Sequence, residues 1–201
     1  MRARMAILLS GQKVRLRELI LRDKPAEMLE ASPKGTVPVL VLASGKVIDE
    51  SLAVMEWAAQ LAPSKIDLPT EESRALIARN DGQFKHDLDR YKYPSRYEDV
   101  DPMAHRQSGG EFLSALNTQL EGQAELSGAK PGFADFAIFP FVRQFRIADP
   151  EWFDAQPWPA LHPWLERHMT SDLFAAAMKK FSLWNETGEE HIFGGDGAVA
   201  A

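Results

Sequence analysis

The first part of the chain alternates short apolar runs with charged turns, and this pattern predicts small α and β elements in alternation. Residues 37–42 are β-branched and apolar on both faces, which is typical of a covered strand. Ser44 and Gly45 supply a tight turn before a return strand that starts at Val47. Apolar residues then recur at helical spacing after Ser51, which this pattern places at a helix N-cap. Upstream of this group the same reasoning predicts a helix over 1–10, a strand over 14–21 and a helix over 25–31.

From about residue 69 onward the apolar spacing is helical throughout. Two prolines, Pro63 and Pro69, bracket a polar linker between the two halves. Residues 133–145 are apolar almost all round, which predicts a buried central helix with Gly132 at its N-cap and Asp135 completing a capping box. We therefore expect an α/β unit over 1–62, a linker over 63–68, an all-helical domain over 69–187, and a glycine- and alanine-rich tail that frays over 188–201.

Composition narrows the class of protein. The chain has 201 residues, 45% of them hydrophobic, which is enough to bury a substantial core. Its formal net charge of −6 argues against a nucleic-acid-binding protein, which needs a basic surface. No apolar run reaches the roughly 18 residues of a membrane span, so we expect a cytoplasmic protein without membrane partners. It contains no cysteine, and its histidines show no metal-binding spacing, so we expect no metal site.

The stretch around residues 37–51 suggests that the protein captures a peptide-like ligand. A cis bond between Val37 and Pro38 would turn the Val37 backbone outward, so that its N–H and C=O can pair with a short antiparallel peptide. The helix that begins near Ser51 offers free amides and a positive dipole end to a carboxylate. The Glu50 side chain can pair with an ammonium group. Taken singly, Pro38 is a strand-entry proline and Ser51 a simple cap; together they predict a ligand with an amino-acid-like end and a central peptide unit.

This arrangement resembles the glutathione transferases, whose thioredoxin-like domain carries a cis-proline after valine and an acidic residue followed by serine at the next helix. The likeness is nearest to the omega-like and related bacterial branch, whose lysine-proline pair is similar to Lys24-Pro25. The resemblance implies a thioredoxin-like α/β domain followed by an all-α domain, a homodimer, and glutathione used with a small electrophilic or disulfide substrate. By resemblance, glutathione would be bound by Lys24, Val37, Pro38, Glu50 and Ser51.

Two features depart from this family. The predicted order of elements lacks one strand at the front, which in the family lies centrally and leads into the catalytic cysteine. The likeness puts that cysteine position a few residues before Met1, so we expect either an upstream start or a rearranged domain. Without a protein thiol, the thiol of bound glutathione would have to be the nucleophile. The alternatives are a non-catalytic binding or dimerisation protein on the same fold, and an N-terminally truncated inactive form.

Cations and aromatic rings alternate at the end of the long helix predicted around residues 77–91. In the resembling fold this helix borders the second-substrate pocket, so Tyr91, Lys92 and Tyr93 are candidates for its lining. The alternative is a helix end that is merely anchored by its tyrosines. Asp87 and Asp89, on the same helix, are expected to be solvated.

Overall fold

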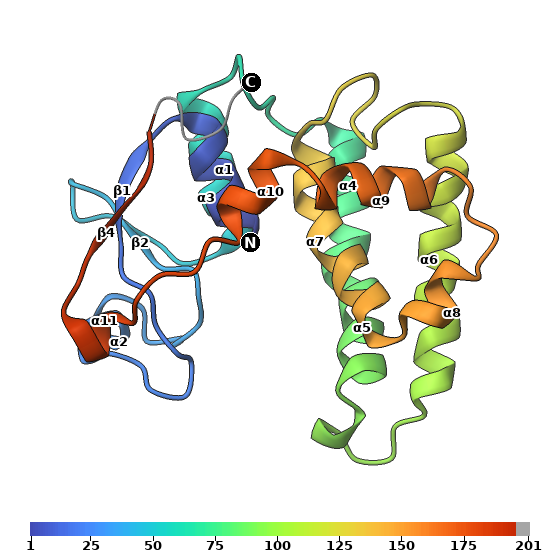
Figure 1. Ribbon diagram of the computed structural model, residues 1–201, viewed down its shortest axis with the longest axis horizontal. Coiled ribbons are helices and arrows are strands. Elements are labelled where there is room, and N and C mark those ends of the chain that lie inside the picture. Colours follow the sequence, from blue (N-terminus) through green and yellow to red (C-terminus); the bar gives the residue numbers. More distant parts are fainter. Residues whose placement is uncertain (196–201) are drawn as a thin grey trace. The chain divides into compact units, whose positions relative to one another are not determined.

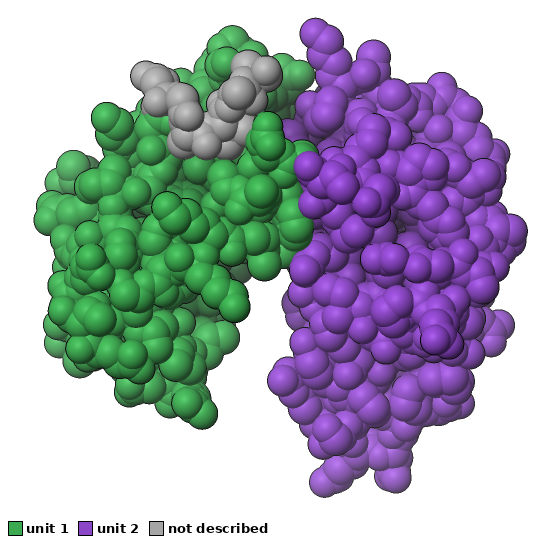
Figure 2. Space-filling view, viewed as in Figure 1, with its two compact units in different colours: residues 1–68, 171–201 green, residues 69–170 purple. Residues whose placement is uncertain are grey.

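The computed structural model describes residues 1–195, and it contains two compact units (Figures 1 and 2). Unit 1 comprises residues 1–68 together with the chain from residue 171 onward, and unit 2 comprises residues 69–170. The segment 171–187, which the sequence analysis assigned to the helical domain, belongs to unit 1.

Unit 1 has the predicted order helix, strand, helix, strand, strand, helix, followed by elements from the C-terminal part of the chain. Helix α1 ends at Gly11, whose φ of 68° and N–H bond to the Leu8 carbonyl are those of a left-handed helix stop. Its apolar side chains are buried against α3 and α10. The elements of unit 1 are α1 (Arg2–Ser10), β1 (Lys13–Leu16), α2 (Ala26–Ala31), β2 (Leu40–Val41), β3 (Val47–Ile48), α3 (Ser51–Leu61), α10 (Asp172–Ala177), α11 (Trp184–Thr187) and β4 (His191–Gly194).

The strands of unit 1 form two separate antiparallel pairs. Strand β2 pairs with β3, with Leu40 opposite Ile48. Strand β1 pairs with β4, with Leu16 opposite His191. Within the described residues, no strand joins β1 to β2.

Two predictions about these strands were wrong. Residues 37–42 were expected to form a covered strand, but only Leu40–Val41 are paired, and the Val41 side chain is 57% exposed because β2 has a single partner strand. The chain from residue 188 was expected to fray, but His191–Gly194 form β4. Phe193 explains the difference, since its ring is buried beside Phe181 and Arg4 and so anchors the strand. The rest of that prediction, residues 196–201, lies outside the described part.

Unit 2 is all helical, as predicted. Its first long helix is interrupted by a π-helical turn, so that the predicted single helix is two α-helical segments joined end to end. The elements are α4 (Glu71–Arg79), the π-helix η1 (Asn80–Phe84), α5 (Lys85–Lys92), the 3-10 helix η2 (Pro94–Arg96), α6 (Pro102–Glu121), α7 (Phe133–Ala148), α8 (Pro150–Asp154) and α9 (Leu161–Met169).

Helix α7 lies at the centre of unit 2, and its buried character was predicted correctly. Ala137, Ile138 and Phe139 are fully buried on consecutive positions, so the helix is covered on all sides. Phe145 packs against Phe84 at 5.3 Å and Tyr91 at 4.9 Å between ring centroids, which ties α7 to η1 and α5. Among the described residues, no helix is both long and apolar enough to cross a bilayer.

Candidate functional site

The N-terminus of α3 is the core of the predicted ligand site. The extended N-cap residue is Glu50 (φ −118°, ψ 134°), and Ser51 is already the first helical residue. The sequence analysis placed Ser51 at the cap, and this was wrong by one residue. The Glu50 side chain makes no capping bond to the helix, because it is held by Lys34 instead. The half-buried Ser51 hydroxyl has no hydrogen-bond partner among the described residues, so it lies free beside the first amides of the helix.

The segment before β2 presents main-chain groups to solvent. The Val37–Pro38 peptide bond is cis, and Val37 is 49% exposed. Within residues 1–195, no hydrogen bond engages the Val37 N–H or C=O, which follows from β2 starting only at Leu40. These two groups are thus available to an extended peptide.

A cluster of charges links this segment to α3. Lys34 Nζ donates to Glu50 Oε1 at 2.9 Å and to Asp49 Oδ1 at 3.3 Å. Ser32 Oγ donates to the other oxygen of Asp49 at 2.8 Å. The hydrogen bonds to Glu50 and Asp49 raise the pKa of Lys34, while those from Ser32 and Lys34 lower the pKa of Asp49. Both shifts favour the charged forms of Lys34 and Asp49, and the Lys34 ammonium lies between the two carboxylates.

Lys24 lies on the other side of the same segment. It precedes Pro25, the N-cap of α2, and its side chain is exposed. A methyl group placed on Gly35 would lie 3.2 Å from Lys24 Nζ, so the ammonium group rests against the Gly35 backbone. Asp23, just before Lys24, is held by a residue from the C-terminal part of the chain, since Asn185 Nδ2 donates to the Asp23 carbonyl at 3.1 Å. Lys34 thus contacts Glu50, and its neighbour Gly35 lies close to Lys24.

The sequence analysis missed Lys34 and Asp49. No local pattern marks Lys34, because its partners follow more than ten residues later across a hairpin. The one available signal was the sequence Asp49-Glu50 just before the predicted helix, because two adjacent carboxylates favour a nearby cation.

Sequence comparison agrees with this geometry. A sequence model of the glutathione S-transferase N-terminal domain matches residues 1–66. A model of the glutathione S-transferase C-terminal domain matches residues 74–167. The chain belongs to the glutathione S-transferase superfamily.

Individual relatives of the superfamily are distant. A probable glutathione S-transferase, MSR-1, from Nicotiana plumbaginifolia is 28% identical over 150 residues, covering 72% of this chain and 68% of the relative. The structure of the bacterial glutathione S-transferase BphK in a ternary complex has a TM-score of 0.73 at 21% identity, covering 88% of this chain and 92% of that one. A sphingomonad glutathione S-transferase complexed with glutathione has a TM-score of 0.69 at 18% identity, covering 88% and 91%. The solved structures show that the fold is shared.

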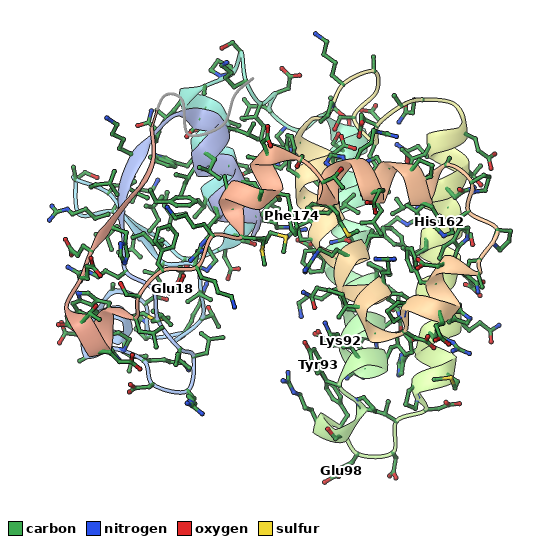
Figure 3. All side chains as sticks on the ribbon, in the orientation of Figure 1. Glu18, Lys92, Tyr93, Glu98, His162 and Phe174 are labelled. Atoms are coloured by element: carbon green, nitrogen blue, oxygen red, sulfur yellow. The ribbon has the colours of Figure 1, made fainter. Side chains whose placement is uncertain are left out.

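The candidate second-substrate residues lie at the end of α5 in unit 2 (Figure 3). Tyr91 is 8% exposed and packs on Phe145, so its ring belongs to the core, as the anchoring alternative expects. Lys92 donates to Gln144 on α7. Tyr93 is half-buried, with the Arg96 guanidinium 4.0 Å from its ring centroid. Of the three, Lys92 and Tyr93 retain accessible surface.

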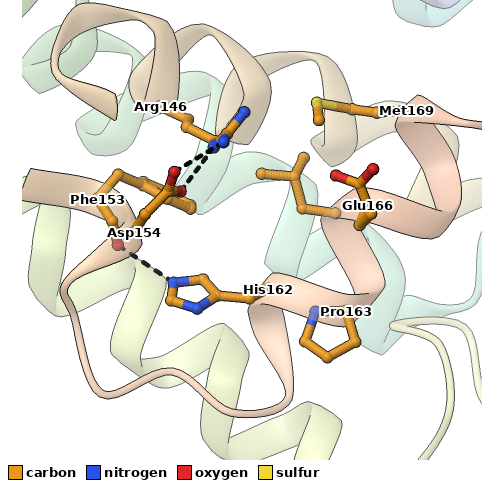
Figure 4. A pocket seen from close by; sticks show the side chains of 8 residues that line it. Arg146, Phe153, Asp154, His162, Pro163, Glu166 and Met169 are labelled. Carbon is orange, nitrogen blue, oxygen red and sulfur yellow. Dashed lines mark hydrogen bonds and ion pairs between the residues drawn. The ribbon is translucent and has the colours of Figure 1, made fainter. Parts of the chain in front are cut away.

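A hollow of about 330 Å³ opens on unit 2 between α7, α8 and α9 (Figure 4). Two of its charged side chains neutralise each other, because Arg146 donates from Nε and Nη2 to the two carboxylate oxygens of Asp154, each at 2.7 Å. His162 Nε2 lies 3.1 Å from the Phe153 carbonyl. The hollow contains none of the residues predicted to bind glutathione.

Proposed function

We propose that this chain binds glutathione at the N-terminus of α3 and uses it as a co-substrate with a small electrophile or disulfide. In this proposal Ser51 and the first α3 amides hold the γ-glutamyl carboxylate, and Val37 pairs with the central peptide. Glu50 holds the ammonium group, and Lys24 contacts the ligand from the other side, in the manner of the omega-like branch. The observation that carries the proposal is the free Ser51 hydroxyl at an uncapped helix start, in the same unit as an exposed Val37 with unpaired main-chain groups.

Lys34 sets the conditions for ligand entry. Its ammonium group is hydrogen-bonded to the Glu50 carboxylate. In the proposed complex the same carboxylate binds the ammonium group of glutathione, so the two cations compete for it. Both side chains are more than half exposed, and ion pairs in such positions contribute little to stability. The ligand therefore displaces Lys34 at small cost, and Asp49 remains as its partner.

Glutathione binding should be measured by titration calorimetry on the full chain. We expect single-site binding in the micromolar to millimolar range. Ser51→Ala and Glu50→Ala should each weaken it about tenfold or more, because each removes a hydrogen bond to a charged group.

Two exposed residues of the same types serve as matched controls. Ser44 lies in the turn between β2 and β3, and Glu30 lies near the end of α2. Ser44→Ala and Glu30→Ala should bind glutathione as the unaltered chain does. Equal affinity in all four variants would refute the proposed site, and no binding in the unaltered chain would favour the non-catalytic alternative.

The chemistry available to this chain is limited by its lack of cysteine. A mixed disulfide between protein and glutathione cannot form, so the thiol of bound glutathione must itself attack the substrate. We expect turnover of a model disulfide, in an assay coupled to glutathione reductase, to stay near the rate of glutathione alone. Robust turnover by the chain as given would overturn this expectation.

The resemblance extends the proposal to a homodimer, and the cytoplasmic location expected from the hydropathy of the chain stays part of the proposal. A dimer that fails to bind glutathione would support the rival function, a binding or dimerisation module on the same fold.

A further inference from the structure

Three potential metal ligands from two helices meet in unit 2, whereas the residues of the proposed glutathione site belong to unit 1. His86 and Asp87 lie on α5, and His105 lies on α6. His105 Nδ1 is 2.7 Å and His86 Nδ1 is 3.5 Å from Asp87 Oδ1, and the ligand atoms all lie within 4.8 Å of one another. The sequence analysis missed this group because its members come from separate helices.

Asp87 was expected to be solvated, but the structure buries it, with only 1% of its surface exposed. Its Oδ2 accepts hydrogen bonds from Ser108 Oγ at 2.6 Å and from Gln83 Nε2 at 3.1 Å. These two bonds fix the carboxylate so that Oδ1 is turned to the imidazoles. The hydrogen bonds that would orient Asp87 as a metal ligand are thus already in place.

The charge of Asp87 has no permanent counter-ion. Among the described residues, no lysine or arginine is paired with it. The Asp87 Oδ1 atom thus faces two imidazole nitrogens, which are possible metal ligands.

We propose that His86, Asp87 and His105 bind a divalent transition-metal ion of the zinc type. Two imidazole nitrogens and one carboxylate oxygen are the donors that zinc prefers, and three protein ligands leave one position for water. Bond lengths of about 2.0–2.2 Å place the ligands of a tetrahedral ion roughly 3.3–3.5 Å apart. The His86–Asp87 separation of 3.5 Å already fits, and the His105–Asp87 pair, now at 2.7 Å, must open by about 0.6–0.8 Å when the ion replaces the hydrogen bond. Hard ions such as Mg²⁺ are disfavoured because they require oxygen ligands.

Zn²⁺ itself is the probe, titrated by calorimetry into the full chain without any histidine tag. We expect one site in the micromolar range at neutral pH. His86→Ala and His105→Ala should each weaken binding at least tenfold. The His86 side chain is 45% exposed and its ring contact is with His105, so its removal should change the stability of unit 2 little. Ser108→Ala should weaken binding by about 10–100-fold without removing a ligand.

His162→Ala is the matched control, since it removes a histidine of the same unit that faces none of these groups. It should bind Zn²⁺ as the unaltered chain does. Co²⁺ gives a second readout, because a tetrahedral site with nitrogen and oxygen ligands produces visible absorption, which His86→Ala should abolish. No binding by the unaltered chain, or equal binding by the His86→Ala and His162→Ala variants, would mean that the cluster is only a hydrogen-bonded anchor between α5 and α6.

Discussion

Replacing Asp135 with alanine is expected to lower the free energy of unfolding by about 3–5 kcal/mol, the largest effect of any single change considered for this chain. Asp135 is fully buried, and its carboxylate accepts hydrogen bonds from the Leu126, Ser127 and Gly132 amides at 2.7–3.1 Å. It also accepts the indole N–H of Trp164 on α9 at 2.8 Å. Alanine would leave four donors without this partner, three of them in the interior, and each buried donor costs about 1–3 kcal/mol unless the structure relaxes.

Urea unfolding followed by far-UV circular dichroism measures this loss. Asp101→Ala is the matched control, because Asp101 also sits at a helix start and accepts the Met103 amide at 2.9 Å, but in an exposed position. It should cost about 1 kcal/mol. If the Asp135→Ala chain does not fold, Asp135→Asn keeps the shape and one acceptor oxygen, and should fold with an intermediate loss. Equal losses at Asp135 and Asp101 would contradict the role assigned to the buried carboxylate.

Gly109→Ala should destabilise the chain by about 2–3 kcal/mol, although alanine is the better helix former. Gly109 is buried in α6, where an added methyl group would lie 2.8 Å from Phe145 Cζ and closer still to Cε2. The Phe145 ring cannot move aside, because it is fully buried between Phe84, Tyr91 and Trp152. Overpacking of a rigid core therefore outweighs the gain in helix propensity of about 0.5–1 kcal/mol.

The adjacent glycine provides the control for this prediction. A methyl group on Gly110 would meet its nearest neighbour, Trp152 Cη2, at 3.5 Å, which is an ordinary contact. Gly110→Ala should therefore leave the chain as stable as before or stabilise it by up to about 1 kcal/mol. The same urea titration compares the two variants, and a Gly109→Ala chain as stable as Gly110→Ala would show that α6 and α7 are not tightly packed at Phe145.

Patterns confined to one segment were sufficient to predict much of this fold. The burial of α7, inferred from its apolar residues on all faces, and its start at Gly132 with Asp135 were predicted from a few consecutive residues, and the structure agrees. The order of elements in the first part of unit 1 was also predicted. In each case the controlling interaction is local, such as a cap or the spacing of apolar residues on one helix face.

The failures involve partners that lie far apart in the sequence. The hydrogen bond from Trp164 to Asp135 and the one from Ser108 to the buried Asp87 depend on how helices pack. The spacing of apolar residues along one helix does not predict such packing. The hydrogen bond from Lys34 to Glu50 and the pairing of β4 with β1 likewise join residues that are far apart in the sequence. The roles assigned to Lys24, Val37, Pro38, Glu50 and Ser51 came from a family resemblance and stay predictions until a ligand is titrated.

The pairing of β1 with β4 has a consequence for how this protein is made. Arg15 meets Glu190 only after 175 further residues have been translated. At roughly 5–20 residues per second, a ribosome needs about 9–35 s to synthesise the chain from β1 to β4. Unit 2 is completed within that time and can begin to fold, while the edge of β1 still lacks β4 as its partner. Nascent chains of this protein therefore carry an open β edge, a feature that invites chaperone binding or pairing between neighbouring polysomal chains.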